Sequence, residues 1–254
     1  MPVFALDDYS TVALCYLAAS ALVAGLARGF SGFGAALIFI PLASAVVGPT
    51  LSAPLLLVID AIGAIGLIPQ AWRLAHKRDV GLMALGGLVG VPLGAFTLTR
   101  TDPTTIRWMI VVLVIGLLAL LISGWRYRGR PVAPLTIGVG GLAGFFSGVA
   151  QMGGPPVVAY WFGQSVPAET VRANIVLYFA ISTIFAIASY LLGGLLTTAI
   201  LGLAIVTGPL YGLGIAIGSR MFGMASEATF RGVSYILIAI AAVISLPVLD
   251  GLVR

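Results

Sequence analysis

Residues 144–156 read Gly-Phe-Phe-Ser-Gly-Val-Ala-Gln-Met-Gly-Gly-Pro-Pro, a glycine-rich stretch with a hydrophobic run on each side. Glycine lets the backbone leave helical geometry and approach a ligand closely. A related stretch, Gly-Leu-Ala-Arg-Gly-Phe-Ser-Gly-Phe-Gly, occupies residues 25–34. The two stretches predict two helical hairpins, each interrupted by a glycine-rich break.

The composition around these breaks is that of a membrane protein. Of 254 residues, 60% are hydrophobic and 8% are charged, whereas about 25% of the residues in a soluble domain are charged. The hydrophobic stretches are 11–29, 33–47, 50–71, 80–99, 106–124, 133–150, 153–163, 170–192, 197–218 and 229–249. A spanning helix needs roughly 20 residues, so 33–47 and 153–163 are short enough to be half-helices or re-entrant segments.

The chain has few residues for catalysis or for binding a cofactor. Lys77 is the only lysine, and there is no G-x-x-x-x-G-K-[ST] motif for binding phosphate. His76, the only histidine, lies in a predicted basic cytoplasmic loop, so neither an intramembrane Ser-His protease nor an H-E-x-x-H zinc site can be assembled. The single cysteine, Cys15, excludes an internal disulfide and a cysteine-only metal site. We therefore expect no enzyme activity, no metal and no cofactor.

The formal net charge of +5 indicates orientation in a membrane rather than a nucleic-acid partner, because the basic residues form no dense face. Basic clusters at 73–78 and 126–130 lie two spans apart, hence on one side of the membrane. The positive-inside rule makes that side cytoplasmic. We expect a multi-pass protein of the cytoplasmic membrane with both termini external.

The two halves of the chain repeat. A shift of 119 residues aligns the glycines of the breaks, which are Gly25, Gly29 and Gly34 with Gly144, Gly148 and Gly153. A shift of 118 aligns Pro49, Gly90 and Gly94 with Pro167, Gly208 and Gly212. Each half is then a broken hairpin plus three crossings, an odd number that inverts the second half. We expect an all-helical membrane protein with inverted repeats at 1–124 and 133–254, joined by a cytoplasmic basic linker at 125–132.

The breaks are the candidate substrate site. Helices that start after such breaks direct N–H groups and a positive dipole end into the gap, which suits an anion. The residues predicted to line the site are Ser31, Gly32, Gly34, Ser147, Gly148, Gln151, Gly153 and Gly154. The alternative is that glycines only permit close helix packing, which is how we interpret Gly86, Gly90, Gly94, Gly208 and Gly212.

Five further polar residues extend the candidate site. Arg28 either binds the anion or reaches the inner membrane surface, and Arg172 either contacts substrate or anchors its helix there. Asp60, the only acid inside an apolar span, either couples transport to protons or pairs within the protein. Asn174 and Tyr178 lie near its counterpart in the second half and offer neutral hydrogen-bonding groups.

Several motifs carry a resemblance to a known family. They are the first break with Pro41, Ser147-Gly148 leading to Gly153-Gly154-Pro155, Pro167 through Arg172-Ala-Asn174, and Thr101-Asp102-Pro103 to Arg107. With these motifs, over nearly its whole length, the chain resembles the sulfite exporter TauE/SafE family of membrane permeases. One departure is Ala35-Ala36, where the family often has more glycine, so the first break is less open. The resemblance implies transport of sulfite, sulfonates or other small sulfur-containing anions, often out of the cell.

We therefore expect a secondary transporter that moves sulfite or an organosulfonate across the cytoplasmic membrane, with export favoured. Alternating access would operate at a midplane site between the two breaks. Two alternatives stay open, namely a passive anion channel and a non-transporting scaffold subunit of the membrane. The expected partners are the small anion and the lipid bilayer. Protons and a second copy of the chain remain open, and no nucleic acid is expected.

Overall fold

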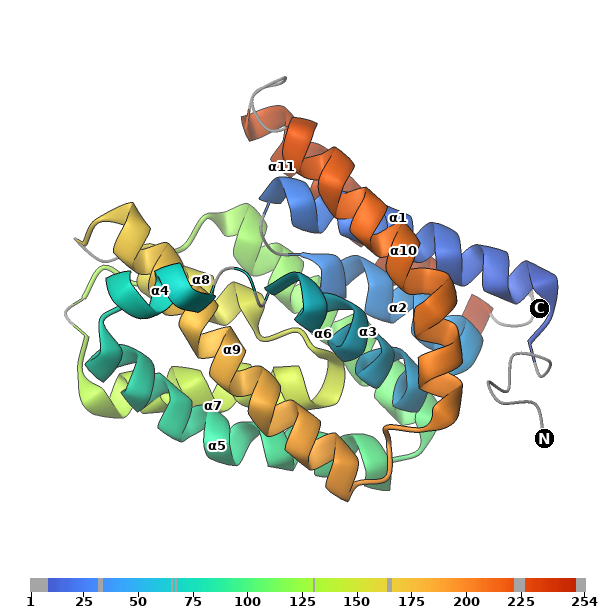
Figure 1. The fold of residues 1–254 in the computed structure, drawn as a ribbon, viewed down its shortest axis with the longest axis horizontal. Helices are drawn as coiled ribbons and strands as arrows, with labels where there is room; N and C mark the ends of the chain where they lie inside the picture. The colour runs from blue at the N-terminus through green and yellow to red at the C-terminus, as the bar shows by residue number, and fades with distance from the viewer. Residues whose placement is uncertain are drawn as a thin grey trace. The chain divides into compact units, whose positions relative to one another are not determined.

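The computed structural model describes residues 9–31, 34–64, 66, 68–129, 131–163, 166–221 and 227–249. Within these ranges the regular secondary structure is helical, without strands (Figure 1). Six of the described helices are long and apolar enough to cross a membrane, by length and composition. These helices confirm the prediction of an all-helical, multi-pass membrane protein.

The first half of the chain contains α1 (Thr11–Ser31), α2 (Ala35–Val47), α3 (Pro49–Ala64), α4 (Ile68–Leu74), α5 (Lys77–Arg100) and α6 (Pro103–Ser123). The second half contains α7 (Ala133–Ala150), α8 (Gly154–Trp161), α9 (Ala168–Leu192), α10 (Thr198–Met221), α11 (Glu227–Ile244) and the short 3-10 helix η2 (Pro247–Leu249). The six candidate spans are α1, α5, α6, α7, α9 and α10.

Both predicted helix breaks are present. The first separates α1 from α2, and the second separates α7 from α8. α2 has 13 residues and α8 has 8, fewer than the roughly 20 that a span needs. Each short helix packs on the long helix before it, so the predicted hairpins are confirmed.

The hydrophobic stretch 50–71, predicted as one segment, forms two helices, α3 and α4. Gly66 lies between them, and Pro69 is the second residue of α4. Glycine is a poor helix former, and proline disrupts a helix interior but is tolerated in the first turn of a helix. Together these residues explain why the helix ends at Ala64 and a new one begins at Ile68.

The helices form two compact units. Unit 1 contains α1, α2, most of α3 and α6, α10 and α11. Unit 2 contains α4, α5, α7, α8 and α9. Each unit thus combines helices from both predicted repeats. The linker boundary at 125–132, the inversion of the halves and the orientation in the membrane stay predictions.

In unit 1, α1 packs along α10 through glycines (Figure 1). A Cβ atom added at Gly25 would lie 3.2 Å from Gly214 Cα, and one added at Gly29 would lie 2.8 Å from Ile215 Cα. Any side chain here would push the two backbones apart. Elsewhere in the unit, Nη2 of the buried Arg107 in α6 donates to the carbonyl oxygen of Ser245 at 3.1 Å, just after α11.

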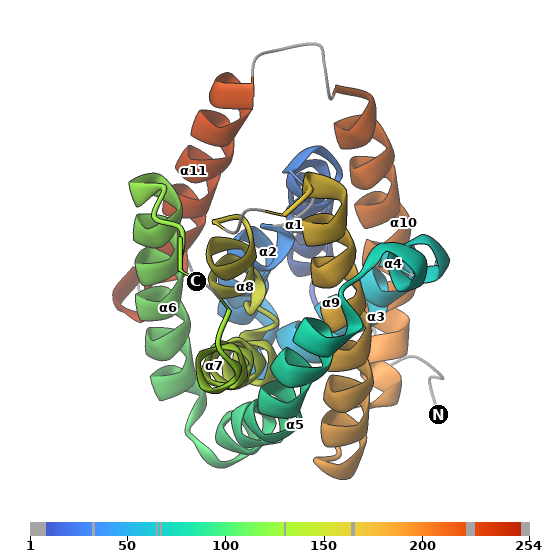
Figure 2. The ribbon, with the colours of Figure 1, turned by 90° about the vertical axis from the view of Figure 1, so that its left-hand side faces the viewer.

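In unit 2, α5 packs along α7 in the same manner (Figure 2). A Cβ atom added at Gly90 would lie 2.8 Å from the amide nitrogen of Phe145, and one added at Gly148 would lie 2.9 Å from Gly94 Cα. Gly86 lies equally close to the α7 backbone. The predicted packing face of Gly86, Gly90 and Gly94 is therefore confirmed.

Equivalent backbone contacts in the two units show that α1 corresponds to α7 and that α5 corresponds to α10. The matching contacts are Gly214 with Leu22 and Leu26 in unit 1, and Gly90 with Gly141 and Phe145 in unit 2. α7 follows α1 by the predicted 119 residues, because Gly141 corresponds to Leu22. α10 follows α5 by 124 residues, because Gly214 corresponds to Gly90.

The prediction that Gly208 and Gly212 form a tight packing face is wrong. Among the described residues, a Cβ atom added at Gly212 would meet nothing within 4 Å, and one at Gly208 would meet only Ile59 Cγ2 at 3.8 Å. The separation between α7 and α10 in the second half is five residues longer than the corresponding separation between α1 and α5 in the first half. The 118-residue shift therefore aligned the wrong glycines, and Gly214 is the one that packs.

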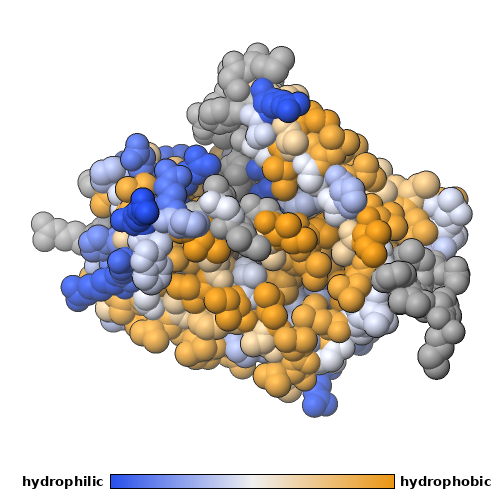
Figure 3. All heavy atoms as spheres, in the orientation of Figure 1, coloured by the Kyte–Doolittle hydropathy of each residue, from blue (hydrophilic) through white to orange (hydrophobic). Residues whose placement is uncertain are grey.

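The outward faces of the long helices are hydrophobic. On α5 the exposed side chains are Leu85, Leu88, Val89, Leu93 and Phe96. Figure 3 shows hydrophobic surface over α9 and, in the other unit, over α10, and hydrophilic surface where α4 meets α5. A membrane-spanning helix contacts lipid along its side and water at its ends, so it needs apolar sides and polar ends.

Candidate substrate site at the second helix break

The break between α7 and α8 is a structured turn. Gln151 follows α7 with φ 57° and ψ 23°, a left-handed conformation found at no other described non-glycine residue. Its amide donates to the carbonyl oxygen of Ser147 at 2.9 Å, and the next amide, of Met152, donates to Phe146 at 3.2 Å. A non-glycine residue in this conformation is strained. The surrounding contacts must therefore hold Gln151 in place.

Tyr190 of α9 supplies those contacts. Its side chain is fully buried, and its hydroxyl donates to the carbonyl oxygen of Gly148 at 2.9 Å. The carbonyl oxygen of Ser147 lies 3.4 Å from the same hydroxyl. The hydroxyl also accepts a hydrogen bond of 3.1 Å from Nε2 of Gln151. Tyr190 thus fixes the last turn of α7 and the Gln151 side chain together.

Ser147 and Gly153 face each other across the break. Both are buried, and a Cβ atom at Gly153 would collide with Ser147 Oγ and with the carbonyl oxygen of Ala143. Position 153 therefore requires glycine on steric grounds. The structure brings together four of the predicted residues, Ser147, Gly148, Gln151 and Gly153, within one turn of unit 2.

The start of α8 offers fewer hydrogen-bond donors than an ordinary helix. Gly154 is its first residue, and Pro155 and Pro156 follow it without an N–H group. Of the backbone amides that a helix start normally presents, only those of Gly153 and Gly154 remain. With Ser147 Oγ and the second N–H of the Gln151 amide, the break can present a small set of neutral donors to an oxyanion.

A family model described as Sulfite exporter TauE/SafE matches residues 17–244 of this chain. The chain belongs to the sulfite exporter TauE/SafE family. Comparisons with curated proteins and with solved structures found no match. TauE/SafE proteins are membrane transporters of sulfite or related anions, so membership of the family implies that this chain is a membrane transporter.

Two predicted site residues of this TauE/SafE chain have structural partners in unit 2. Oδ1 of the buried Asn174 accepts a hydrogen bond of 2.7 Å from the backbone amide of His76, at the turn between α4 and α5. The hydroxyl of Tyr178 donates to the carbonyl oxygen of Gly140 at 3.1 Å. The side chain of Arg172 is exposed. A substrate contact from any of these three stays a prediction.

The first break of the TauE/SafE chain belongs to unit 1. Gly34 precedes α2 with φ 99°, a conformation that favours glycine. The side chain of Ser31 and all of Gly32 lie outside the described residues. Arg28 and Asp60 are half-buried, and each interacts with neighbouring groups. The predicted meeting of the two breaks at one site stays a prediction.

Sequence reasoning missed Tyr190. It lies near the end of the hydrophobic stretch 170–192, where a tyrosine has no distinguishing local signal. Its partners Gly148 and Gln151 are about forty residues earlier in the chain. A polar hydroxyl within an apolar stretch was the available signal, because such a group needs a partner when it is buried.

Proposed function

We propose that this chain is a secondary transporter that carries sulfite or an organosulfonate across the cytoplasmic membrane, with export as the favoured direction. The observation that carries this proposal is the α7–α8 break, where Tyr190 holds Gln151 in a left-handed turn. Strained residues that the surrounding structure holds in place are concentrated at functional sites. Family membership supports the substrate class.

The chemistry of the break fits an anion that must be bound and then released. We propose that the donors come from Ser147, Gln151, Gly153 and Gly154. These groups are neutral dipoles, which attract an oxyanion less strongly than a fixed positive charge does. A transport site needs binding that favours entry and still permits exit. Donors of this kind meet both requirements.

We further propose that the two hairpin breaks take part in alternating access, as inverted-repeat transporters do. In this proposal Arg28 adds positive charge near the first break. Asp60 is the candidate for proton coupling, because it is the only acidic residue inside a predicted apolar span. The test for coupling is Asp60→Asn, which should abolish uptake driven by a pH gradient while leaving counterflow intact.

The first test is sulfite counterflow in proteoliposomes. Gln151→Gly removes the amide donor and also relieves the backbone strain at φ 57°. We expect an unchanged or higher melting temperature and about a tenfold rise in the KM for sulfite, the effect of one hydrogen bond to a charged group. Gln70→Ala, at an exposed position in α4, is the matched control. A wild-type KM in Gln151→Gly would contradict this placement of the site.

The same assay separates the alternatives. A carrier shows saturable flux and counterflow, whereas a passive channel shows neither. A scaffold subunit would move no sulfite at all and would co-purify with another chain in fixed ratio.

A further inference from the structure

Trp161, the last residue of α8, has a buried polar group for which the described part of the chain offers no partner. The side chain is 0% exposed. Within the described residues, its indole Nε1 makes no hydrogen bond. Buried polar groups in folded proteins nearly always have a partner, and an exception calls for a specific explanation.

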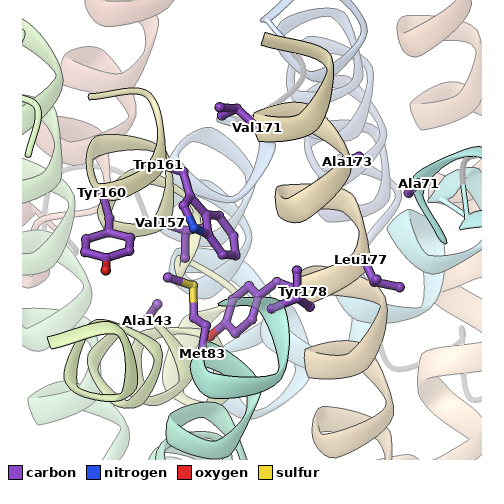
Figure 4. Close-up of a cluster of buried hydrophobic side chains, with 11 residues drawn as sticks. Ala71, Met83, Ala143, Val157, Tyr160, Trp161, Val171, Ala173, Leu177 and Tyr178 are labelled. Atoms are coloured by element: carbon purple, nitrogen blue, oxygen red, sulfur yellow. The ribbon is translucent and has the colours of Figure 1, made fainter. Parts of the chain in front are cut away.

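The surroundings of Trp161 are apolar (Figure 4). The indole ring lies edge-to-face with Tyr178, with 6.2 Å between ring centroids. Val157, Met83 and Ala143 belong to the same cluster. An N–H group left without an acceptor in such a place lowers stability. Phenylalanine, a smaller aromatic residue, would bring no such polar group, so apolar packing does not account for the indole nitrogen.

The position of the ring relates it to the helix break. Side chains on a helix lean toward its N-terminus, and Figure 4 shows the indole nitrogen beside Val157, one turn closer to the break than Trp161 itself. α8 begins at Gly154, immediately after the break. The donor therefore lies along α8, between the candidate site and the far end of the same helix.

We propose that the indole N–H of Trp161 is a second binding point for the transported oxyanion, and donates to one of its oxygens once it has left the α7–α8 break. This inference rests on the proposed function. An indole nitrogen is a donor only, so its ligand must bring an acceptor. The apolar wall strengthens that hydrogen bond because it excludes competing water.

The decisive variant is Trp161→Phe, which keeps an aromatic ring and removes the N–H. We expect its melting temperature to stay near that of the wild type, because losing a buried donor without an acceptor offsets the small cavity that the smaller ring leaves. We also expect the KM for sulfite in counterflow to rise at least fivefold. Trp125→Phe removes an exposed indole and is the matched control. A wild-type KM in Trp161→Phe would overturn the inference.

A spectroscopic measurement gives an independent readout. The other three tryptophans, Trp72, Trp108 and Trp125, are exposed. Replacing all three by phenylalanine leaves Trp161 as the sole indole fluorophore. Sulfite should then shift the fluorescence emission of Trp161, and the shift should saturate with sulfite concentration. Chloride at the same concentration should cause no shift. No shift, in a protein that still transports sulfite, overturns the role of Trp161 and leaves the proposed function standing. A wild-type protein without sulfite flux contradicts the proposed function itself.

Discussion

The hydroxyl of Tyr190 in α9 donates to the carbonyl oxygen of Gly148 in α7 at 2.9 Å, and this hydroxyl in turn accepts a hydrogen bond from Nε2 of Gln151. One buried hydroxyl therefore links a span to the end of another span and to the turn that follows it. Because Gln151 is strained, its conformation depends on this link.

Tyr190→Phe should loosen the break without creating a cavity. The variant leaves the Gly148 carbonyl and the Gln151 amide without their shared partner, which costs about 1–3 kcal/mol for a buried group. We expect a lower melting temperature together with a higher KM for sulfite. Thr136→Val removes another buried hydroxyl from the first turn of α7, at the opposite end of that helix from the break, and should lower only the melting temperature. An unchanged KM in Tyr190→Phe would show that Tyr190 has no part in the site.

Alanine substitutions on α10 test the revised register. Gly214→Ala places a methyl group against the α1 backbone near Gly25, and overpacking of this kind costs about 1–3 kcal/mol. Gly212→Ala faces open space and should be neutral or raise stability by about 0.5–1 kcal/mol through lower backbone entropy. Thermal unfolding in detergent measures both. Equal effects of the two substitutions would contradict the 124-residue relation between α5 and α10.

Asp102 at the start of α6 should make stability depend on acid pH. Its carboxylate accepts hydrogen bonds from the backbone amides of Thr104 and Thr105, both at 2.9 Å, and from the Thr105 hydroxyl. The Thr105 hydroxyl, followed by these amides, lowers the pKa of Asp102 below its ordinary value. The stabilisation is therefore present at neutral pH and is lost as pH falls through the lowered pKa.

The measurement for Asp102 compares melting temperatures at pH 7 and at a pH near 3. Asp102→Ala should melt below the wild type at pH 7, and the difference should shrink in acid. Asp102→Asn should keep part of the effect, since asparagine also accepts hydrogen bonds at a helix start. A difference between wild type and Asp102→Ala that is as large in acid as at pH 7 would contradict this account.

Asn174→Ala separates a structural role from a substrate contact. The Asn174 side chain accepts a hydrogen bond from the His76 amide, so its loss should destabilise the turn between α4 and α5. We expect a lower melting temperature with an unchanged KM for sulfite. A raised KM would instead establish the predicted contact of Asn174 with the anion.

The helix breaks were predictable because their cause is local. Glycines and prolines disfavour a helix wherever they stand, so residues 25–34 and 144–156 identify both hairpins. The register of α10 was not predictable from the sequence. Several glycines in that helix repeat at similar spacing, and only the contact with α1 identifies Gly214 as the one that packs. Tyr190 escaped for a related reason. Its role depends on which helices surround it, and neighbours from distant parts of the chain leave no local pattern.

The pairing of α1 with α10 has a consequence for synthesis of the chain. Only α6 separates α5 from α7 in the sequence, and unit 2 can close once residue 193 has been made. The glycine face of α1, at Gly25 and Gly29, meets its partner only when Gly214 emerges. α1 must therefore wait, with this packing face uncovered, until α10 has been made. Contacts between such distant segments form slowly, so unit 1 should be the last part of the nascent chain to assemble.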